Sequence, residues 1–117
     1  MDLSELVDAL VSRDALRARQ WVADAARSGF DWTRVVEPRG LDPLGLAVAA
    51  AVVEMIAARQ GVAPASWTAS VPAAPHRVFL VRAAESMPRL RRLCEAEGPE
   101  PLRRRGLLAP PEFLTSA

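Results

Sequence analysis

One stretch limits the possible folds of this chain more than any other. Residues 41–61 read LDPLGLAVAAAVVEMIAARQG, and almost every position between the two ends is apolar. Asp42 is suited to cap the N-terminus of a helix, Pro43 to occupy its first turn, and Gly61 to end it. A helix that is apolar on every face has to be buried on every face. We therefore expect a buried central helix at residues 43–60, with the other elements packed around it.

The same stretch bears on location. Its uninterrupted apolar run, Leu44 to Val53, stops at Glu54, well short of the ~20 residues that a membrane-spanning helix needs. The first ten residues, MDLSELVDAL, lack the basic segment that begins a signal peptide. We therefore expect a cytoplasmic protein of bacterial type that does not enter the membrane.

The N-terminal third predicts two amphipathic helices. Asp2 and Glu5 form a capping-box pattern, and the apolar residues that follow recur at the helical period. Ser12 is suited to cap a second helix at residues 13–28. A short helix at residues 31–36 is expected to close one end of the core.

The C-terminal half predicts shorter elements. After a proline-rich loop, a helix is expected to begin near Pro75 and to run through HRVFLVRAAES. Ser86 is suited to cap a following helix that ends at Gly98, and PEPLRRRG is expected to form one helical turn. Two consecutive prolines, at 110 and 111, favour an extended tail.

No segment alternates between apolar and polar residues, and no Asn-Gly or Asp-Gly hairpin turn occurs. We therefore predict an all-α fold: a single compact bundle of about five helices in residues 1–105, around the helix at 43–60. An extended, proline-containing C-terminal tail at residues 106–117 completes the chain.

The sequence offers few candidate residues for catalysis or metal binding. The chain has one histidine and one cysteine, whereas a structural zinc site needs four such ligands. Cys94 continues an apolar helical stripe with Leu90 and Leu93, which favours a small buried side chain over a nucleophile. His76 lies at a predicted helix start, and no glycine-rich phosphate loop is present. We predict no catalytic, metal or cofactor-binding residues, and a protein that is not an enzyme.

The basic residues form a candidate patch. All 15 are arginines, against 14 acidic residues, and six fall within 17 positions. Such a patch can contact phosphates. Glutamates are interleaved with it and no aromatic residue accompanies it for base stacking, which favours a solvated face with local ion pairs. The candidate nucleic-acid contacts are Arg89, Arg91 and Arg92, together with the triplet Arg103, Arg104 and Arg105.

The apolar residues of the tail allow two interpretations. They either close the protein's own bundle or dock on a partner, as extended segments of many binding proteins do. In the second case the arginine triplet meets acidic groups of the partner while the apolar residues anchor it. The candidate partner-binding residues are Arg103, Arg104, Arg105, Leu107, Leu108, Phe113 and Leu114.

A resemblance favours the second interpretation. The segments VVEMIAARQGVAPASW and PEPLRRRGLLAPPEFL, with Phe79 between them, resemble a group of small helical bacterial proteins encoded beside nucleotidyltransferase-like toxins. The resemblance covers residues 44–114 and implies an antitoxin-like protein that binds and neutralises a toxin partner. Some members of that group carry a DNA-binding helix-turn-helix, which this chain lacks. The alternative hypothesis is a regulatory protein that binds DNA or RNA through the arginine patch.

Overall fold

The long apolar helix forms the centre of the fold. In the computed structural model, which describes residues 1–115, helix α3 spans Pro43–Gln60 and every residue from Ala47 to Ala57 is buried. The Gly45 N–H donates to the Asp42 carboxylate at 2.7 Å, and Gly61 ends the helix with a φ of 71°. By length and composition alone α3 could cross a membrane, but 67% of it is buried inside the fold, as in the core helix of a folded domain.

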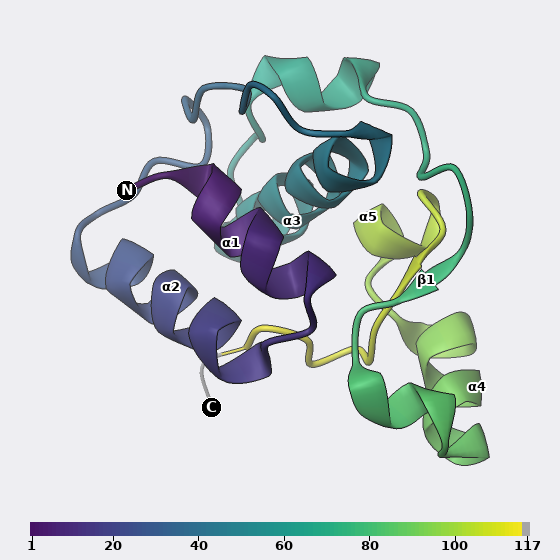
Figure 1. The fold of residues 1–117 in the computed structure, drawn as a ribbon. Coiled ribbons are helices and arrows are strands. Elements are labelled where there is room, and N and C mark those ends of the chain that lie inside the picture. The colour runs from purple at the N-terminus through teal and green to yellow at the C-terminus, as the bar shows by residue number, and fades with distance from the viewer. Residues whose placement is uncertain (116–117) are drawn as a thin grey trace.

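Two further helices cover one side of α3. Helix α1 spans Leu3–Val11 and lies against α3, and helix α2 spans Ala15–Arg27 and packs on α1 (Figure 1). The expected cap of the second helix is wrong. Asp14 caps α2 by accepting from the Arg17 N–H at 3.1 Å, while the Ser12 hydroxyl donates back to the Asp8 carbonyl of α1. A left-handed Arg13 makes the tight turn between them and so shifts the cap by two residues.

The segment between α2 and α3 contains no helix. The expected helix at residues 31–36 is instead a turn, in which Asp31 accepts hydrogen bonds from the amide and hydroxyl of Thr33. An aromatic cluster fills this end of the core: the ring of Phe30 lies 5.3 Å from Trp21 and 4.7 Å from Trp32. The Asp31 side chain offers the Thr33 N–H a partner in place of a helical hydrogen bond, which favours a turn over a helix.

The expected helix from Pro75 is also wrong. Val78–Phe79 form strand β1, which pairs in parallel with strand β2, Leu107–Leu108. The Val78 N–H donates to the Gly106 carbonyl and the Leu80 N–H to the Leu108 carbonyl, each at 2.9 Å. Two 3₁₀ helices, η1 and η2, at Ser66–Ser70 and Arg82–Glu85, complete this region. Valine and phenylalanine favour extended backbone, and a distant partner strand was available to pair with them.

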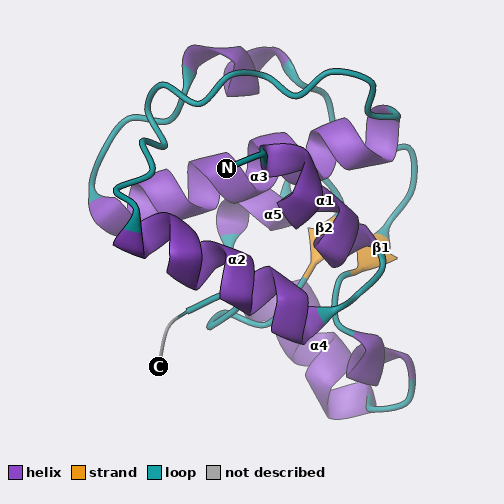
Figure 2. Cartoon of the chain, turned by 60° about the vertical axis from the view of Figure 1, so that its left-hand side comes forward, coloured by secondary structure: helices purple, strands orange, loops and turns teal. Residues whose placement is uncertain are grey.

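Two short helices follow. Helix α4 spans Pro88–Glu97 and projects with η2 from the rest of the molecule, as both ribbon views show (Figure 2). Its N-cap position is held by Met87 without a side-chain hydrogen bond, so the expected Ser86 cap is wrong. Helix α5 spans Glu100–Arg103 and packs on α3. The prediction of a compact, mostly helical chain is confirmed, with a radius of gyration of 13.2 Å.

The tail runs back across the bundle. Residues 106–115 leave α5 as strand β2 and then pass beneath the α1–α2 turn (Figure 1). Leu107 and Leu108 are buried, and Phe113 is only 9% exposed. Residues 107–108 are extended, but residues 111–114 form a turn, so the tail is not extended throughout. Leu107, Leu108 and Phe113 lie in the core of the same chain.

Candidate functional site

The last arginine of the triplet is buried. The Arg105 side chain is 5% exposed and pairs with the Glu54 carboxylate in the middle of α3. Its second terminal nitrogen also donates to the Thr68 carbonyl at 2.8 Å, whereas its Nε has no partner among the described residues. Arg104 adds a hydrogen bond to Glu54 at 2.5 Å. Burial raises the pKa of Glu54, but the hydrogen bonds from Arg105 and Arg104 outweigh it, so the net pKa is lowered.

The side chain of the first arginine of the triplet caps the C-terminal end of α4. The Arg103 guanidinium donates to the Gly98 carbonyl at 2.8 Å and to the Ala96 carbonyl at 3.1 Å. It therefore satisfies carbonyl groups that the last turn of α4 leaves without partners. Each arginine of the triplet thus has a role inside the chain itself.

The structure divides the seven candidate partner-binding residues into two sets. Arg103 and Arg104 are exposed and Leu114 is half-buried, so a partner can reach them. The other four are at most 9% exposed, and a partner can reach them only if the fold opens: Arg105, Leu107, Leu108 and Phe113.

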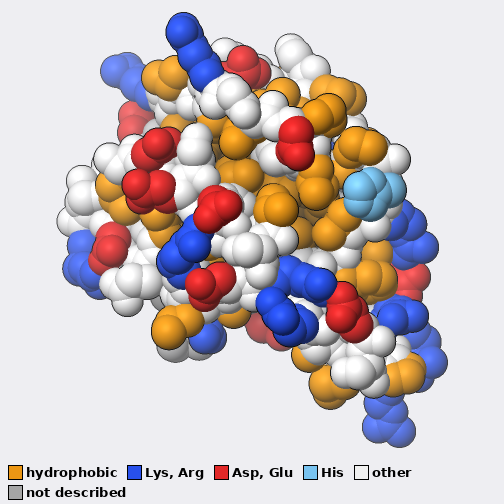
Figure 3. All heavy atoms as spheres, viewed as in Figure 1, with side chains coloured by type: hydrophobic (Ala, Val, Ile, Leu, Met, Phe, Trp, Pro, Cys, Tyr) orange, Lys and Arg blue, Asp and Glu red, His pale blue; other side chains and the backbone are white. Residues whose placement is uncertain are grey.

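Of the six candidate nucleic-acid contacts, the three outside the triplet lie on α4. Arg91 is held by the Ala84 and Glu85 carbonyls, and its guanidinium lies 5.4 Å from the centre of the Phe79 ring. Arg89 and Arg92 are exposed and form no ion pair within residues 1–115. Figure 3 shows basic side chains gathered at the corner where α4 projects.

The two residues with catalytic potential differ in their exposure. Cys94 is fully buried, and this burial raises the pKa of its thiol. His76 is exposed. Within the described residues, no three His, Cys, Asp or Glu side chains come together as metal ligands.

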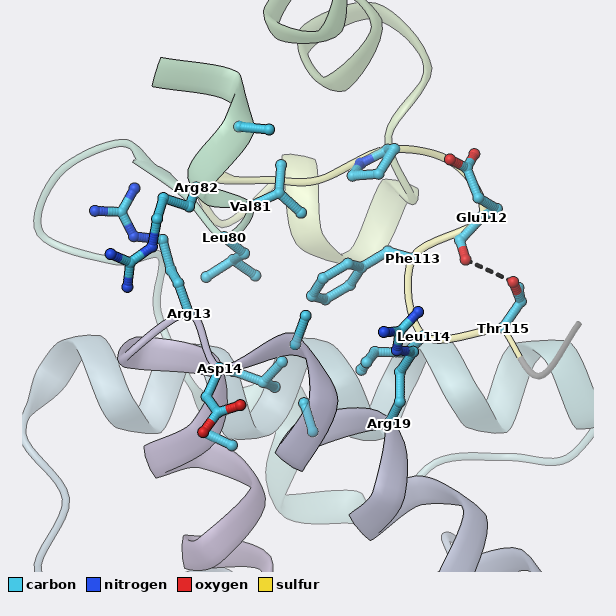
Figure 4. Close-up of a pocket in the computed structure, with 16 residues that line it drawn as sticks. Arg13, Asp14, Arg19, Leu80, Val81, Arg82, Glu112, Phe113, Leu114 and Thr115 are labelled. Atoms are coloured by element: carbon cyan, nitrogen blue, oxygen red, sulfur yellow. Dashed lines mark hydrogen bonds between the residues drawn. The ribbon is translucent and has the colours of Figure 1, made fainter. Parts of the chain in front are cut away.

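One hollow lies where the tail passes beneath the α1–α2 turn. We call it the tail groove; it holds about 520 Å³ and is bounded by the α1–α2 turn, the chain at residues 80–83 and the tail at residues 110–115 (Figure 4). Its volume is in the range of ligand-binding clefts, about 300–1,000 Å³. The apolar side chains on its floor belong to the core: Ala9, Leu10, Ala18, Leu80 and Phe113. The polar side chains around it are Arg13, Asp14, Arg19, Arg82, Glu112 and Thr115.

Backbone strain gathers at this groove. Within the described residues, only Arg13 and Leu114 among non-glycine residues have positive φ, at 59° and 58°, and both line the groove. A left-handed conformation costs a side chain with a β-carbon roughly 1–2 kcal/mol. Strained residues are concentrated at binding and catalytic sites, where the surrounding structure holds them in place.

One arginine fixes the tail wall of the groove. Arg59, in the last turn of α3, donates to the Phe113 carbonyl at 2.6 Å and to the Pro111 carbonyl at 3.2 Å. Partial burial lowers the pKa of its guanidinium. The groove thus has a wall that is pinned from the central helix.

Sequence reasoning identified the tail but missed the groove and Arg59. The apolar pattern singled out Phe113 and Leu114, and both line the groove. Two signals could have indicated the buried ion pair. Glu54 is a charge in a helix that is otherwise apolar, so it needs a buried cation as a partner, and the arginine triplet is a group of candidate cations. No family model, no curated protein and no solved structure matches this chain.

Proposed function

We propose that this protein is a non-enzymatic interaction module that binds a segment of a protein partner in the tail groove. Its biological role is that of an antitoxin-like protein that neutralises a toxin. The observation that carries the proposal is the groove itself: an apolar floor, a polar rim and a pinned wall. Binding grooves for extended or helical peptides combine these features.

The arrangement of the tail supports this site over the tail as a free arm. Leu107 and Leu108 are committed to β2 and the core, so they anchor the groove rather than a partner. The half-buried Leu114 lines the groove beside the almost buried Phe113 and can contact an occupant from within the fold. A partner therefore binds a surface that the tail helps to build.

The polar groups around the groove suit binding better than catalysis. Asp14 caps α2, and Arg13 is paired with Glu85, so both already have structural partners. Neither His76 nor Cys94 lines the groove. General acid–base or nucleophilic chemistry would need such a group within hydrogen-bond reach of a substrate.

Filling the groove from its rim tests the proposal. Ala15 and Ala83 line the groove and are exposed, so Ala15→Trp or Ala83→Trp fills it without disturbing the core. Ala26→Trp, at an exposed position about 16 Å farther along α2, is the matched control. The partner to use is the product of the adjacent gene, co-expressed with each variant.

We expect Ala15→Trp and Ala83→Trp to lose co-purification with that product and rescue of growth, while Ala26→Trp retains both. Equal binding by all three variants would exclude the groove as the site. Circular dichroism and thermal unfolding of each variant separate loss of binding from loss of folding.

A second candidate function rests on α4. Arg89 and Arg92 are exposed on a helix that projects from the body, and a nucleic-acid backbone can reach them. Binding to a labelled duplex should then weaken with salt, and Arg89→Ser with Arg92→Ser should reduce the slope of log K against log salt by about two. Absence of a complex at low salt removes this candidate.

A further inference from the structure

We infer that the occupant of the tail groove is an elongated apolar peptide segment that carries an acidic side chain, and that Arg19 receives this acid. The inference rests on the proposed function and specifies the chemistry of the partner. It follows from three observations: the shape of the surface beside the groove, the apolar residues along that surface, and the pairing of the charged side chains on the rim.

The groove continues beyond the tail. A second hollow of about 330 Å³ lies along the outer face of α2 and shares three of its lining residues with the tail groove: Arg19, Leu114 and Thr115. The two hollows therefore meet at a common ridge. A compact small molecule would fill only one of them, whereas a peptide segment can lie across both.

The second hollow offers apolar contacts. Leu16 and Val22 line it, and Leu16 is 72% exposed, although it lies beside a half-buried Leu114. Single exposed leucines are common on protein surfaces. This one extends the apolar floor of the tail groove, so an occupant with apolar side chains on both sides of the ridge would cover it.

The charges of the rim select the polar group of the occupant. Arg13 is paired with Glu85, Asp14 caps α2, and Arg82 donates to the Ser12 carbonyl at 3.5 Å. The Arg19 side chain lines both hollows and has no hydrogen-bond or ion-pair partner within residues 1–115. Figure 4 shows its guanidinium beside Leu114, at the ridge.

An acidic side chain placed at this ridge pairs with Arg19 while apolar neighbours fill the two hollows. A basic side chain there would meet the like charge of Arg19. Charge complementarity of this kind governs partner choice more than total affinity. Glu112 is at the other end of the tail groove in Figure 4, away from Arg13 and Arg82.

The test uses the full chain and displayed peptides of random sequence. Peptides are selected on the wild-type protein and depleted on the blocked Ala15→Trp variant. We expect the enriched sequences to contain Asp or Glu flanked on both sides by large apolar residues. The best peptide is then synthesised and its affinity measured for wild type, Arg19→Glu and the control Arg34→Glu. Arg34 carries the same charge on an 88%-exposed side chain, in the segment that follows α2.

We expect Arg19→Glu to weaken binding about tenfold, because an attractive contact becomes repulsive, while Arg34→Glu stays within about twofold of wild type. A peptide with the acid replaced by lysine should prefer Arg19→Glu. The inference is overturned if selection yields no binder, if the enriched peptides lack an acidic residue, or if Arg19→Glu binds as wild type does.

The outcome is separable from that of the proposed function. If the natural partner loses binding to Ala15→Trp but not to Arg19→Glu, the groove is the site and only the acidic occupant is wrong. If the partner binds both variants as well as wild type, the proposed function itself is wrong.

Discussion

Arg105 and Glu54 form a buried ion pair that joins the turn after α5 to the middle of the central helix. Their side chains are 5% and 8% exposed, and Arg105 also donates to the Thr68 carbonyl of η1. A single guanidinium thus connects α5, α3 and η1. Arg104 shares the same carboxylate from a half-exposed position.

This pair predicts a strong asymmetry between single and double variants. Arg105→Met leaves the Glu54 carboxylate buried with only Arg104 as a partner, and we expect a loss of about 3–5 kcal/mol in the free energy of unfolding. Glu54→Leu leaves Arg105 uncompensated, with a similar expected loss. The double variant removes both charges and should recover most of the stability, because neither is then buried alone. Urea unfolding measures all three, and a double variant as unstable as the summed singles would contradict the prediction.

The same pair predicts how stability depends on pH. The folded protein holds the pKa of Glu54 below its ordinary value of 4.5, because the hydrogen bonds from Arg105 and Arg104 outweigh burial. Between the folded and unfolded pKa values, the unfolded chain therefore binds more protons than the folded one. The contribution of Glu54 is fully present above pH 4.5 and is lost as pH falls through the folded pKa.

The measurement is urea unfolding of wild type and Glu54→Gln at a series of pH values from 7 to 3. We expect the stability difference between them to be constant above about pH 5 and to shrink below it, since glutamine does not titrate. A difference that stays constant down to pH 3 would show that Glu54 does not contribute in this way.

The elements that were predicted correctly from the sequence are those that depend on a local pattern of residues. Helix α3 is apolar on all faces and begins and ends at residues suited to those positions, so its bounds followed directly. The consecutive prolines of the tail likewise excluded a helix there. These features depend on residues within one or two turns of each other.

The elements that sequence missed depend on distant partners. Strand β1 consists of two residues whose pairing partners are Leu107 and Leu108, and no local pattern reveals such a pair. Ser12 and Asp14 are both good helix caps, and the left-handed turn at Arg13 decided between them. The tail groove arises only where the α1–α2 turn, residues 80–83 and the tail meet.

Gly98 predicts a steric effect at the contact between α4 and the tail. A β-carbon at this position would lie 2.5 Å from the Ala109 carbonyl oxygen and 2.6 Å from the Cys94 carbonyl oxygen. Its φ of −61° suits any residue, so the cost of Gly98→Ala is steric and we expect a loss of about 3 kcal/mol.

Gly29→Ala is the matched control for that variant. Gly29 has a φ of 70°, and no atom lies within 4 Å of the position that an alanine methyl group would take, so its substitution costs only about 1 kcal/mol of backbone strain. Thermal or urea unfolding compares the two. A Gly98→Ala variant no less stable than Gly29→Ala would mean that the tail moves easily away from α4.

Arg59 predicts a link between the central helix and the shape of the groove. Arg59→Met retains an aliphatic stem but removes the guanidinium that donates to the Phe113 and Pro111 carbonyls. At about 1 kcal/mol for each hydrogen bond, we expect about 2 kcal/mol less stability, concentrated in the tail. Hydrogen exchange should speed up at the Phe113 and Thr115 amides, which donate within the tail, more than at the Leu80 amide of the strand pair. Arg39→Met, at an exposed position in the loop before α3, is the control.

Because the tail is a wall of the groove, the peptide selected on wild type should also bind Arg59→Met more weakly. Unchanged exchange at both tail amides would show that the strand pair and Phe113 hold the tail without Arg59.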